Sequence, residues 1–562
     1  MLKSDSLIRI FLRFYKPEIR DLWIIFTYAF VTGALFLVVP IAANSLVTTI
    51  AFGQLLQPLA VLSLFVLFGL LFAALLKVAQ VKLVELMQQR LFVRQATTLT
   101  STLTRIDYQF TRDIYAPGIV NRFLEVVVIQ KVTSQMMMEG LGVVFQVFTG
   151  LVLISFYHPY LLIFGLALLF MIAIILLVGA GATKSAVIES TKKYELLDWL
   201  EDIARFPLLF KSAWGGRLAR RKADQLILNY IGSRRQHFKV LVRQYIGAYS
   251  VQAIGSSLLL ILGGWLVMIN ELTLGQLVSA EIVVSASVAS VSKLGKTFES
   301  IYDLFAAVVK VEAVKDLPLE KHDGTICLDA DRPFEVSFSE IVLRNRSQDF
   351  KPINLTVATG SKIAIFGRNA SGKSTLANYL LGLELPVAGQ VKLQGVDIRD
   401  LDLLSLRSQV HLVRGIEVLA GSIEINVNCL RPQIASEDVL KALEQVGLLE
   451  IIQKLPEGIR TNLSPGGAPL STGQLAQLML ARAIVGKPRL IVLDETLDTI
   501  DPLSLKYIYQ VLLDPKAPWT LIDLTSDPVV WSGFESHYRL SATGLQALAA
   551  GVSVEKLSDI ES

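Results

Sequence analysis

The chain has 562 residues, of which 18% are charged, a formal net charge of +4 and a mean hydropathy of +0.53. This length exceeds one compact domain, and this hydropathy excludes a purely soluble protein. The basic residues lie at the borders of apolar segments rather than on one soluble face, so nothing favours a nucleic-acid partner. The two cysteines, Cys327 and Cys429, have no CxxC spacing, which argues against a disulfide framework or a zinc site.

The first 21 residues mix five basic side chains with aromatic and aliphatic ones. No small-residue cleavage site precedes the first long apolar stretch. We therefore expect a retained amphipathic segment on the cytoplasmic membrane surface rather than a signal peptide.

Six stretches approach the roughly 20 apolar residues that a bilayer-crossing helix needs. A buried helix of a soluble protein is the alternative for any single stretch, but six of them grouped before residue 300 favour a polytopic membrane domain with six transmembrane helices. The stretches are residues 22–44, 58–76, 138–157, 160–180, 246–269 and 274–291.

The orientation follows from Lys and Arg. The connections 45–57, 158–159 and 270–273 contain neither residue, whereas the other connections are rich in both. Both termini are then cytoplasmic, which predicts an inner (cytoplasmic) membrane protein. The two long internal connections predict helices over 77–103, 184–205 and 222–243 that extend the membrane helices into the cytoplasm.

The composition changes near Leu317, so we divide the chain into a membrane domain, 1–317, a soluble domain, 318–550, and a tail, 551–562. In the soluble part, apolar strand-like runs alternate with helical stretches, which predicts an α/β domain with a largely parallel sheet. The predicted strands are 362–366, 409–413, 489–493 and 520–524, and the main helices are 374–383 and 472–485.

A glycine-rich loop between the strand 362–366 and the following helix has the pattern of a phosphate-binding P-loop. Its backbone N–H groups can cradle phosphates, Lys373 can reach the β and γ phosphates of ATP, and Ser374 can hold Mg²⁺. The predicted nucleotide-binding residues are Gly367, Arg368, Asn369, Ala370, Ser371, Gly372, Lys373, Ser374 and Thr375.

An acidic pair follows the apolar strand 489–493. Asp494 is the second expected Mg²⁺ ligand, and Glu495 is the expected catalytic residue that activates water. Apolar strands that end in acidic residues are common, so the pair indicates an ATPase only together with the phosphate loop.

Between these motifs the chain reads Leu470-Ser471-Thr472-Gly473-Gln474, which resembles the signature of the ABC ATPase family with one glycine changed to Thr472. The resemblance implies that Ser471, Gly473 and Gln474 contact ATP held by an opposite subunit. Asp501 resembles the characteristic residue of the family's dimer-contacting loop.

The membrane half is similar to the same family. Residues 272–278 resemble the entry to the sixth helix of peptide and protein exporters, and residues 117–123 and 205–214 resemble its two coupling segments. The resemblance spans about residues 9–540 and implies half of an ABC exporter of the type I secretion kind. The implied partner is a second half-transporter, and exporters of this kind can also bind a periplasmic adaptor.

Three accessory positions depart from the family pattern. Asn345 stands where an aromatic side chain usually stacks on adenine, although an alignment shifted by one residue is the alternative there. Loss of that stacking costs about 1–3 kcal/mol. Gly415 replaces the glutamine that links Mg²⁺ and water to the coupling helices, and Ser526 replaces the histidine that contacts the γ-phosphate.

These departures predict an impaired ATP site, because losing one group that stabilises a developing charge slows turnover by about 10²-fold or more. They favour a heterodimer with a complete ATPase subunit over a homodimer. A regulatory or scaffold ABC protein that binds ATP with little hydrolysis is the alternative to an exporter.

Glu281 is an ionisable residue inside the sixth membrane stretch, where it costs several kcal/mol unless it is paired or hydrated. It either lines the pathway, facing a cationic substrate or a partner helix, or is a hydrated residue near the helix end.

Overall fold

The computed structural model describes residues 7–51, 56–113, 116–179, 181–321, 323–329, 331–343, 351–526, 533–541 and 543–548. The chain forms two compact units. The first comprises Met1–Ile106 and Asp113–Leu319, and the second comprises Asp107–Arg112 and Glu320–Ser562. The tail that we delimited at 551–562 lies outside the described residues.

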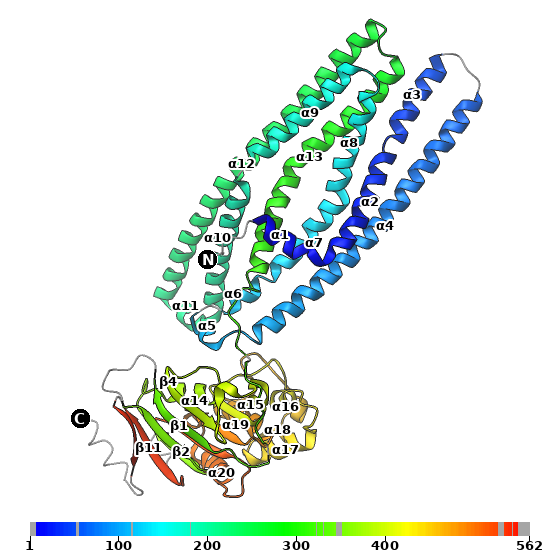
Figure 1. The fold of residues 1–562 in the computed structure, drawn as a ribbon. Coiled ribbons are helices and arrows are strands. Elements are labelled where there is room, and N and C mark those ends of the chain that lie inside the picture. The colour runs from blue at the N-terminus through cyan, green and yellow to red at the C-terminus, as the bar shows by residue number, and fades with distance from the viewer. Residues whose placement is uncertain are drawn as a thin grey trace. The chain divides into compact units, whose positions relative to one another are not determined.

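The first unit is helical (Figure 1). Its α-helices are α1 (Leu7–Tyr15), α2 (Ile19–Leu35), α3 (Val38–Ala51), α4 (Leu56–Leu103), α6 (Ala116–Asn121), α7 (Leu124–Gln135), α8 (Leu141–Ser155), α9 (Pro159–Val178), α10 (Ala182–Arg205), α11 (Pro207–Lys211), α12 (Ala213–Met268) and α13 (Leu274–Glu312). A 3₁₀ turn, η1 (Lys16–Glu18), follows α1, and a π-helical turn, η2 (Met136–Gly140), joins α7 to α8.

Apolar helices occupy all six predicted membrane stretches. By length and composition, the described helices Arg9–Ile50, Gln57–Leu103, Gly118–Ser155 and Ala213–Met268 can cross a membrane, and Pro159–Ile175 and Leu274–Ser290 are shorter apolar helices. α4 and α12 have 48 and 56 residues, which is about 72 and 84 Å of helix against a hydrocarbon core of about 30 Å. Both therefore continue beyond the membrane, as the predicted helices 77–103 and 222–243 require.

Two predicted continuous helices are interrupted. The first stretch breaks at residues 36–37, between α2 and α3, because Pro40 has no N–H to donate to residue 36 and its ring clashes with that carbonyl. The fourth stretch ends at Val178, and α10 begins after Gly181, whose φ of +91° is a left-handed conformation that glycine adopts without strain.

α13 lies at the centre of the first unit, in contact with α3, α7, α8, α10 and α12. The packing is close. A Cβ on Gly150 of α8 would lie 2.6 Å from Cγ1 of Val283 on α13. Small residues at such crossings allow helix backbones to approach closely within a membrane, so α8 and α13 pack closely at Gly150.

The second unit contains a parallel sheet with one antiparallel edge strand, in the order β12-β11-β3-β10-β9-β6, and a four-stranded antiparallel sheet, β2-β1-β4-β5. All four predicted strands are confirmed within a residue, as β3, β6, β9 and β10. The strands are β1 (Val336–Val342), β2 (Ile353–Val357), β3 (Lys362–Phe366), β4 (Ala388–Leu393), β5 (Val396–Asp397), β6 (Val410–Arg414), β7 (Gly421–Ser422), β8 (Asn462–Leu463), β9 (Leu490–Asp494), β10 (Thr520–Thr525), β11 (Ser536–Ser541) and β12 (Gly544–Leu548).

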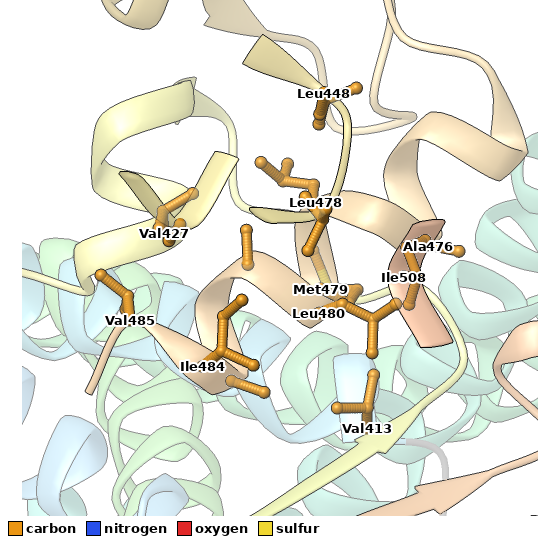
Figure 2. Close-up of a cluster of buried hydrophobic side chains, with 14 of the residues drawn as sticks. Val413, Val427, Leu448, Ala476, Leu478, Met479, Leu480, Ile484, Val485 and Ile508 are labelled. Carbon is orange, nitrogen blue, oxygen red and sulfur yellow. The ribbon is translucent and has the colours of Figure 1, made fainter. Parts of the chain in front are cut away.

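Helices cover this sheet and pack into an apolar core. Figure 2 shows Leu478, Leu480 and Ile484 of α19 among side chains from β6, α16 and α20. This core fixes α19, and with it the motif at the start of that helix. The helices are α5 (Tyr108–Asp113), α14 (Lys373–Leu380), α15 (Leu403–Gln409), α16 (Ile423–Asn428), α17 (Ser436–Gln445), α18 (Leu449–Gln453), α19 (Thr472–Ile484) and α20 (Pro502–Leu512), with 3₁₀ turns η3 (Ile398–Asp400), η4 (Gly458–Arg460) and η5 (Leu497–Thr499).

Candidate nucleotide site

The predicted phosphate loop connects β3 to α14. Two of its residues have a positive φ, Ala370 at +64° and Gly372 at +105°, and Gly372 is the N-cap of α14. A Cβ on Gly367 would lie 2.5 Å from Ser371 Oγ and 2.7 Å from the carbonyl oxygen of Leu540, so only glycine fits there. The loop therefore ends at the N-terminus of α14, and a helix N-terminus that follows a glycine-rich loop binds anions.

Lys373 is buried beneath this loop, with 4% of its side chain exposed. Its ammonium donates hydrogen bonds to the carbonyl oxygens of Gly367 and Arg368 and lies 3.1 Å from Glu495 Oε1. Ser371 Oγ is buried and has no hydrogen-bond partner. A buried cation beside an unpartnered hydroxyl fits a phosphate group, because a phosphate oxygen accepts from both.

The acidic pair stands at the same edge of the sheet as the phosphate loop. The parallel register pairs Phe366 with Thr525, Leu524 with Asp494 and Asp494 with Arg414, so the carboxyl ends of β3, β10, β9 and β6 meet there. Glu495 follows Asp494 with a φ of +53°, and 41% of its side chain is exposed. The sheet thus brings the predicted Lys373, Asp494 and Glu495 together.

Arg414 is a member of this site that the sequence reasoning missed. Its Nε lies 2.5 Å from Asp494 Oδ2. Its terminal nitrogens donate to Asn378 Oδ1 at 2.8 Å and to the carbonyl oxygen of Ser374 at 2.9 Å. The predicted strand ends at residues 413 and 493 were the available part of the signal, but they place Arg414 beside Asp494 only once β6 and β9 are known to be parallel neighbours.

Of the two expected Mg²⁺ donors, Ser374 and Asp494, the carboxylate of Asp494 does not fit a divalent cation in this arrangement. Asp494 is buried, its Oδ2 is held by Arg414, and its Oδ1 has no hydrogen-bond partner. A metal ion on Oδ1 would lie beside a guanidinium that cannot lose its proton, and the two positive charges would repel each other.

The signature-like residues cap the start of α19. Ser471 is the N-cap, and the Gln474 side chain accepts from the Ser471 N–H at 2.9 Å. Ser471 is exposed, and a Cβ on Gly473 would lie 3.1 Å from the carbonyl oxygen of Thr499. Asp501 likewise caps α20 by accepting from Leu503 and Ser504, and these hydrogen bonds lower the pKa of its carboxyl. Capping accounts locally for Ser471, Gln474 and Asp501.

Of the three departures from the family pattern, Asn345 lies outside the described residues. Gly415 directly follows β6 with a φ of +61°, which favours glycine, and nothing lies within 4 Å of where its Cβ would be. Ser526 directly follows β10 and is half-buried. Arg414 rather than residue 415 therefore presents the side chain that reaches the acidic strand.

Residues 117–123, which we expected to be the first coupling segment, belong to the first unit. The stretch Asp107–Arg112, which includes most of α5, belongs to the second unit instead. Arg112 pairs there with Glu384 at 3.2 Å, and the Tyr108 hydroxyl accepts from Arg414 at 3.3 Å. The chain stretch that enters the second unit thus starts about ten residues earlier than expected.

In the first unit, Glu281 Oε1 accepts from Ser285 Oγ at 2.6 Å, while Glu281 Oε2 is buried without a hydrogen-bond partner. No ion pair of Glu281 is seen among the described residues. A pathway role for Glu281 stays a prediction.

Residues 350–498 match the family model described as ABC transporter. This stretch contains the phosphate loop, the signature-like motif and the acidic pair. The second unit therefore contains an ABC transporter domain over these residues. The whole chain resembles a bacterial Atm1-family ABC exporter with ATP bound, with a TM-score of 0.80, 17% identity, and coverage of 97% of this chain and 96% of that one. The chain therefore has the ABC exporter fold, a helical membrane domain followed by an ATPase domain.

Similar proteins of named function are toxin translocation proteins. The exotoxin translocation ATP-binding protein PaxB of Pasteurella aerogenes is 30% identical over 285 residues, and the alpha-hemolysin translocation ATP-binding protein HlyB of Escherichia coli is 31% identical over 290 residues. Each match covers 50% of this chain and 40% of the relative. The similarity thus spans two fifths of the length of these relatives.

Proposed function

We propose that the chain is one subunit of an ATP-driven ABC exporter that moves a peptide, a protein or an amphipathic molecule out of the cytoplasm. The observation that carries this proposal is the exporter fold over 97% of the chain, with the phosphate loop of Lys373 in its ATPase domain. The translocation proteins PaxB and HlyB among its relatives support the peptide or protein class of substrate.

In this proposal, ATP binds at the loop from Gly367 to Thr375, and closure of two ATPase domains on ATP moves the helix bundle between inward and outward states. Lys373 holds the phosphates, and Glu495 orients or deprotonates the attacking water. Turnover at this site is slow. Arg414 engages Asp494, and Gly415 and Ser526 have no side chain that replaces the usual accessory contacts.

The partner is a second ABC half-transporter. Ser471, Gly473 and Gln474 at the exposed start of α19 serve the partner's ATP, and Asp501 belongs to the loop that meets the partner. A heterodimer with a complete ATPase subunit is favoured over a homodimer, since a homodimer would have two impaired sites. The assembly resides in the inner membrane with its ATPase domains in the cytoplasm, and a periplasmic adaptor completes it if the cargo must also cross an outer membrane.

A regulatory or scaffold ABC protein is the second candidate. The ion pair between Arg414 and Asp494 favours it, because that pair withholds a carboxylate that hydrolysis would use. The two candidates differ in whether ATP drives net movement of a substrate.

Vesicle uptake distinguishes them. The full chain, alone and with a co-purified ABC partner, is reconstituted into inside-out vesicles and supplied with a fluorescent mixture of amphipathic peptides. An exporter accumulates peptide only with ATP, and its ATPase rate rises with peptide concentration. Robust ATP binding in every preparation, without peptide uptake or stimulated ATPase, would leave the regulatory protein as the better description.

A further inference from the structure

Arg414 sits where four oxygen atoms converge. They are Asp494 Oδ2 at 2.5 Å, Asn378 Oδ1 at 2.8 Å, the Ser374 carbonyl oxygen at 2.9 Å and the Tyr108 hydroxyl at 3.3 Å. Three of the residues that donate these oxygens belong to the sheet edge and helix that frame the phosphate loop. A set of converging oxygens with one carboxylate is the environment of a bound cation, and here the cation is a side chain.

The position of Arg414 is built into the sheet. Its backbone pairs with Asp494 in the parallel register of β6 and β9. Asp494 is 3% exposed and Arg414 is 28% exposed, so the pair is largely removed from water. Breaking a buried pair leaves an uncompensated charge behind, which makes release of Arg414 costly. The remaining exposed part of the guanidinium lies at the same edge of the sheet as the phosphate loop.

We propose that Arg414 takes the place of the divalent cation at this chain's own nucleotide site, so that ATP binds here without Mg²⁺. The guanidinium carries a permanent positive charge and presents several N–H donors in one plane, a geometry that suits phosphate oxygens. One such group supplies charge and hydrogen bonds at Asp494, which is the one carboxylate among the expected metal ligands. The inference rests on the proposed ATP binding at the loop of Lys373 and specifies how that site differs from a metal-dependent one.

The arrangement also explains why this site can bind ATP and yet hydrolyse it slowly. A guanidinium fixed by four acceptors can neutralise bound phosphate but cannot coordinate and move with the β and γ phosphates as a hydrated metal ion does. Tyr108 ties the same guanidinium to the stretch Asp107–Arg112, which is continuous in the chain with α4 and α6. The site is thereby suited to sense ATP rather than to consume it.

The test is photolabelling of this chain by 8-azido-ATP as a function of concentration, in Mg²⁺ and in EDTA. Labelling reports binding at this chain even when a partner subunit is present. The wild-type affinity should change by less than about threefold between the two buffers. Arg414→Gln removes the charge and offers a neutral amide, and its affinity in EDTA should fall by about tenfold to a hundredfold, the range of one charge-assisted hydrogen bond, whereas Mg²⁺ should restore it.

Two variants keep the test clear. Arg399→Gln removes the same charge from a partly exposed arginine of η3 that pairs with Asp397 and is not a residue of the phosphate loop, and it should behave as wild type. Arg414→Lys keeps a positive charge that can pair with Asp494, so it should fold even if Arg414→Gln does not, and it should still bind in EDTA, more weakly than wild type. Thermal unfolding without nucleotide checks the fold of each variant.

Mn²⁺ provides a readout that does not depend on affinity. Electron paramagnetic resonance of Mn²⁺ with ATP should show no protein-bound metal at this chain in wild type and a bound signal in Arg414→Gln. Wild-type labelling that requires Mg²⁺, or a bound Mn²⁺ signal in wild type, would overturn the inference and leave the proposed function standing. Absence of labelling in both buffers would overturn the proposed function and the inference with it.

Discussion

The Lys373 ammonium and the Glu495 carboxylate lie 3.1 Å apart across the phosphate loop. Lys373 is buried and Glu495 is partly exposed, so the lysine is held while the glutamate is free to turn toward solvent. Because an ammonium prefers the denser charge of a triphosphate, ATP should draw Lys373 away from Glu495 and release the carboxylate.

Lys373→Ala should therefore abolish ATP binding. Removal of the buried cation costs about 3 kcal/mol, roughly 150-fold in affinity. Titration of the full chain with a fluorescent ATP analogue measures the effect. Lys441→Ala, which removes an exposed lysine paired with Glu437 on α17, is the matched control and should leave affinity unchanged. Equal affinity of Lys373→Ala and wild type would refute binding at this loop.

The membrane topology is open to a direct test. In a background without Cys327 and Cys429, which are both exposed, a cysteine at Ser45 on α3 should react with a membrane-impermeant maleimide added to intact cells. A cysteine at Arg112 should react only after the cells are permeabilised. The opposite pattern would reverse the orientation and with it the direction of export.

In a complex with a complete partner, substitution of Ser471, which serves the partner's ATP, should affect total ATPase activity more than substitution of Glu495 in this chain's own ATP site. Ser471→Arg should block total ATPase activity, because it places a bulky cation at the exposed start of α19 that serves the partner's ATP. Ser471→Ala removes only the cap, at a cost of about 1 kcal/mol in stability, and controls for folding. Glu495→Gln should lower total turnover by less than about twofold, since the slow site contributes little. A near-total loss from Glu495→Gln with little effect of Ser471→Arg would show that the productive site is the other one.

His411 on β6 should make the ATPase domain less stable in mild acid. Its ring donates from Nδ1 to the carbonyl oxygen of Ala483, and burial lowers the pKa of its imidazole. The unfolded chain then binds a proton that the folded chain does not. The contribution of His411 to the free energy of unfolding is therefore complete above about pH 6.5 and decreases as the pH falls, by at most about 1.4 kcal/mol per pH unit. When the pH is lowered from 7.5 to 5.5, the unfolding temperature of the ATPase domain should fall less in His411→Gln than in wild type. Parallel curves for the two proteins would exclude this contribution.

The sequence alone determined the elements that local rules control. Long apolar stretches without charge can cross a bilayer only as helices, so the six membrane stretches were readable from composition. The strands that carry Lys373 and Asp494 were readable as well, since a fully buried parallel strand is a short apolar run next to a glycine-rich turn. Pro40 and Gly181 interrupt helices that the apolar pattern alone presents as continuous.

Only the tertiary structure decided what the altered site contains. Gly415 is the residue at which the family pattern fails in the sequence, yet the side chain that matters is its neighbour Arg414. The contact between Arg414 and Asp494 joins residues 80 positions apart. It depends on the parallel register of β6 and β9, which the residue pattern of neither strand specifies. Long-range pairing is fixed by the packing of the whole sheet. The sequence therefore predicted an impaired ATP site with its Mg²⁺ ligands intact, and only the fold showed that Arg414 pairs with one of those ligands, Asp494.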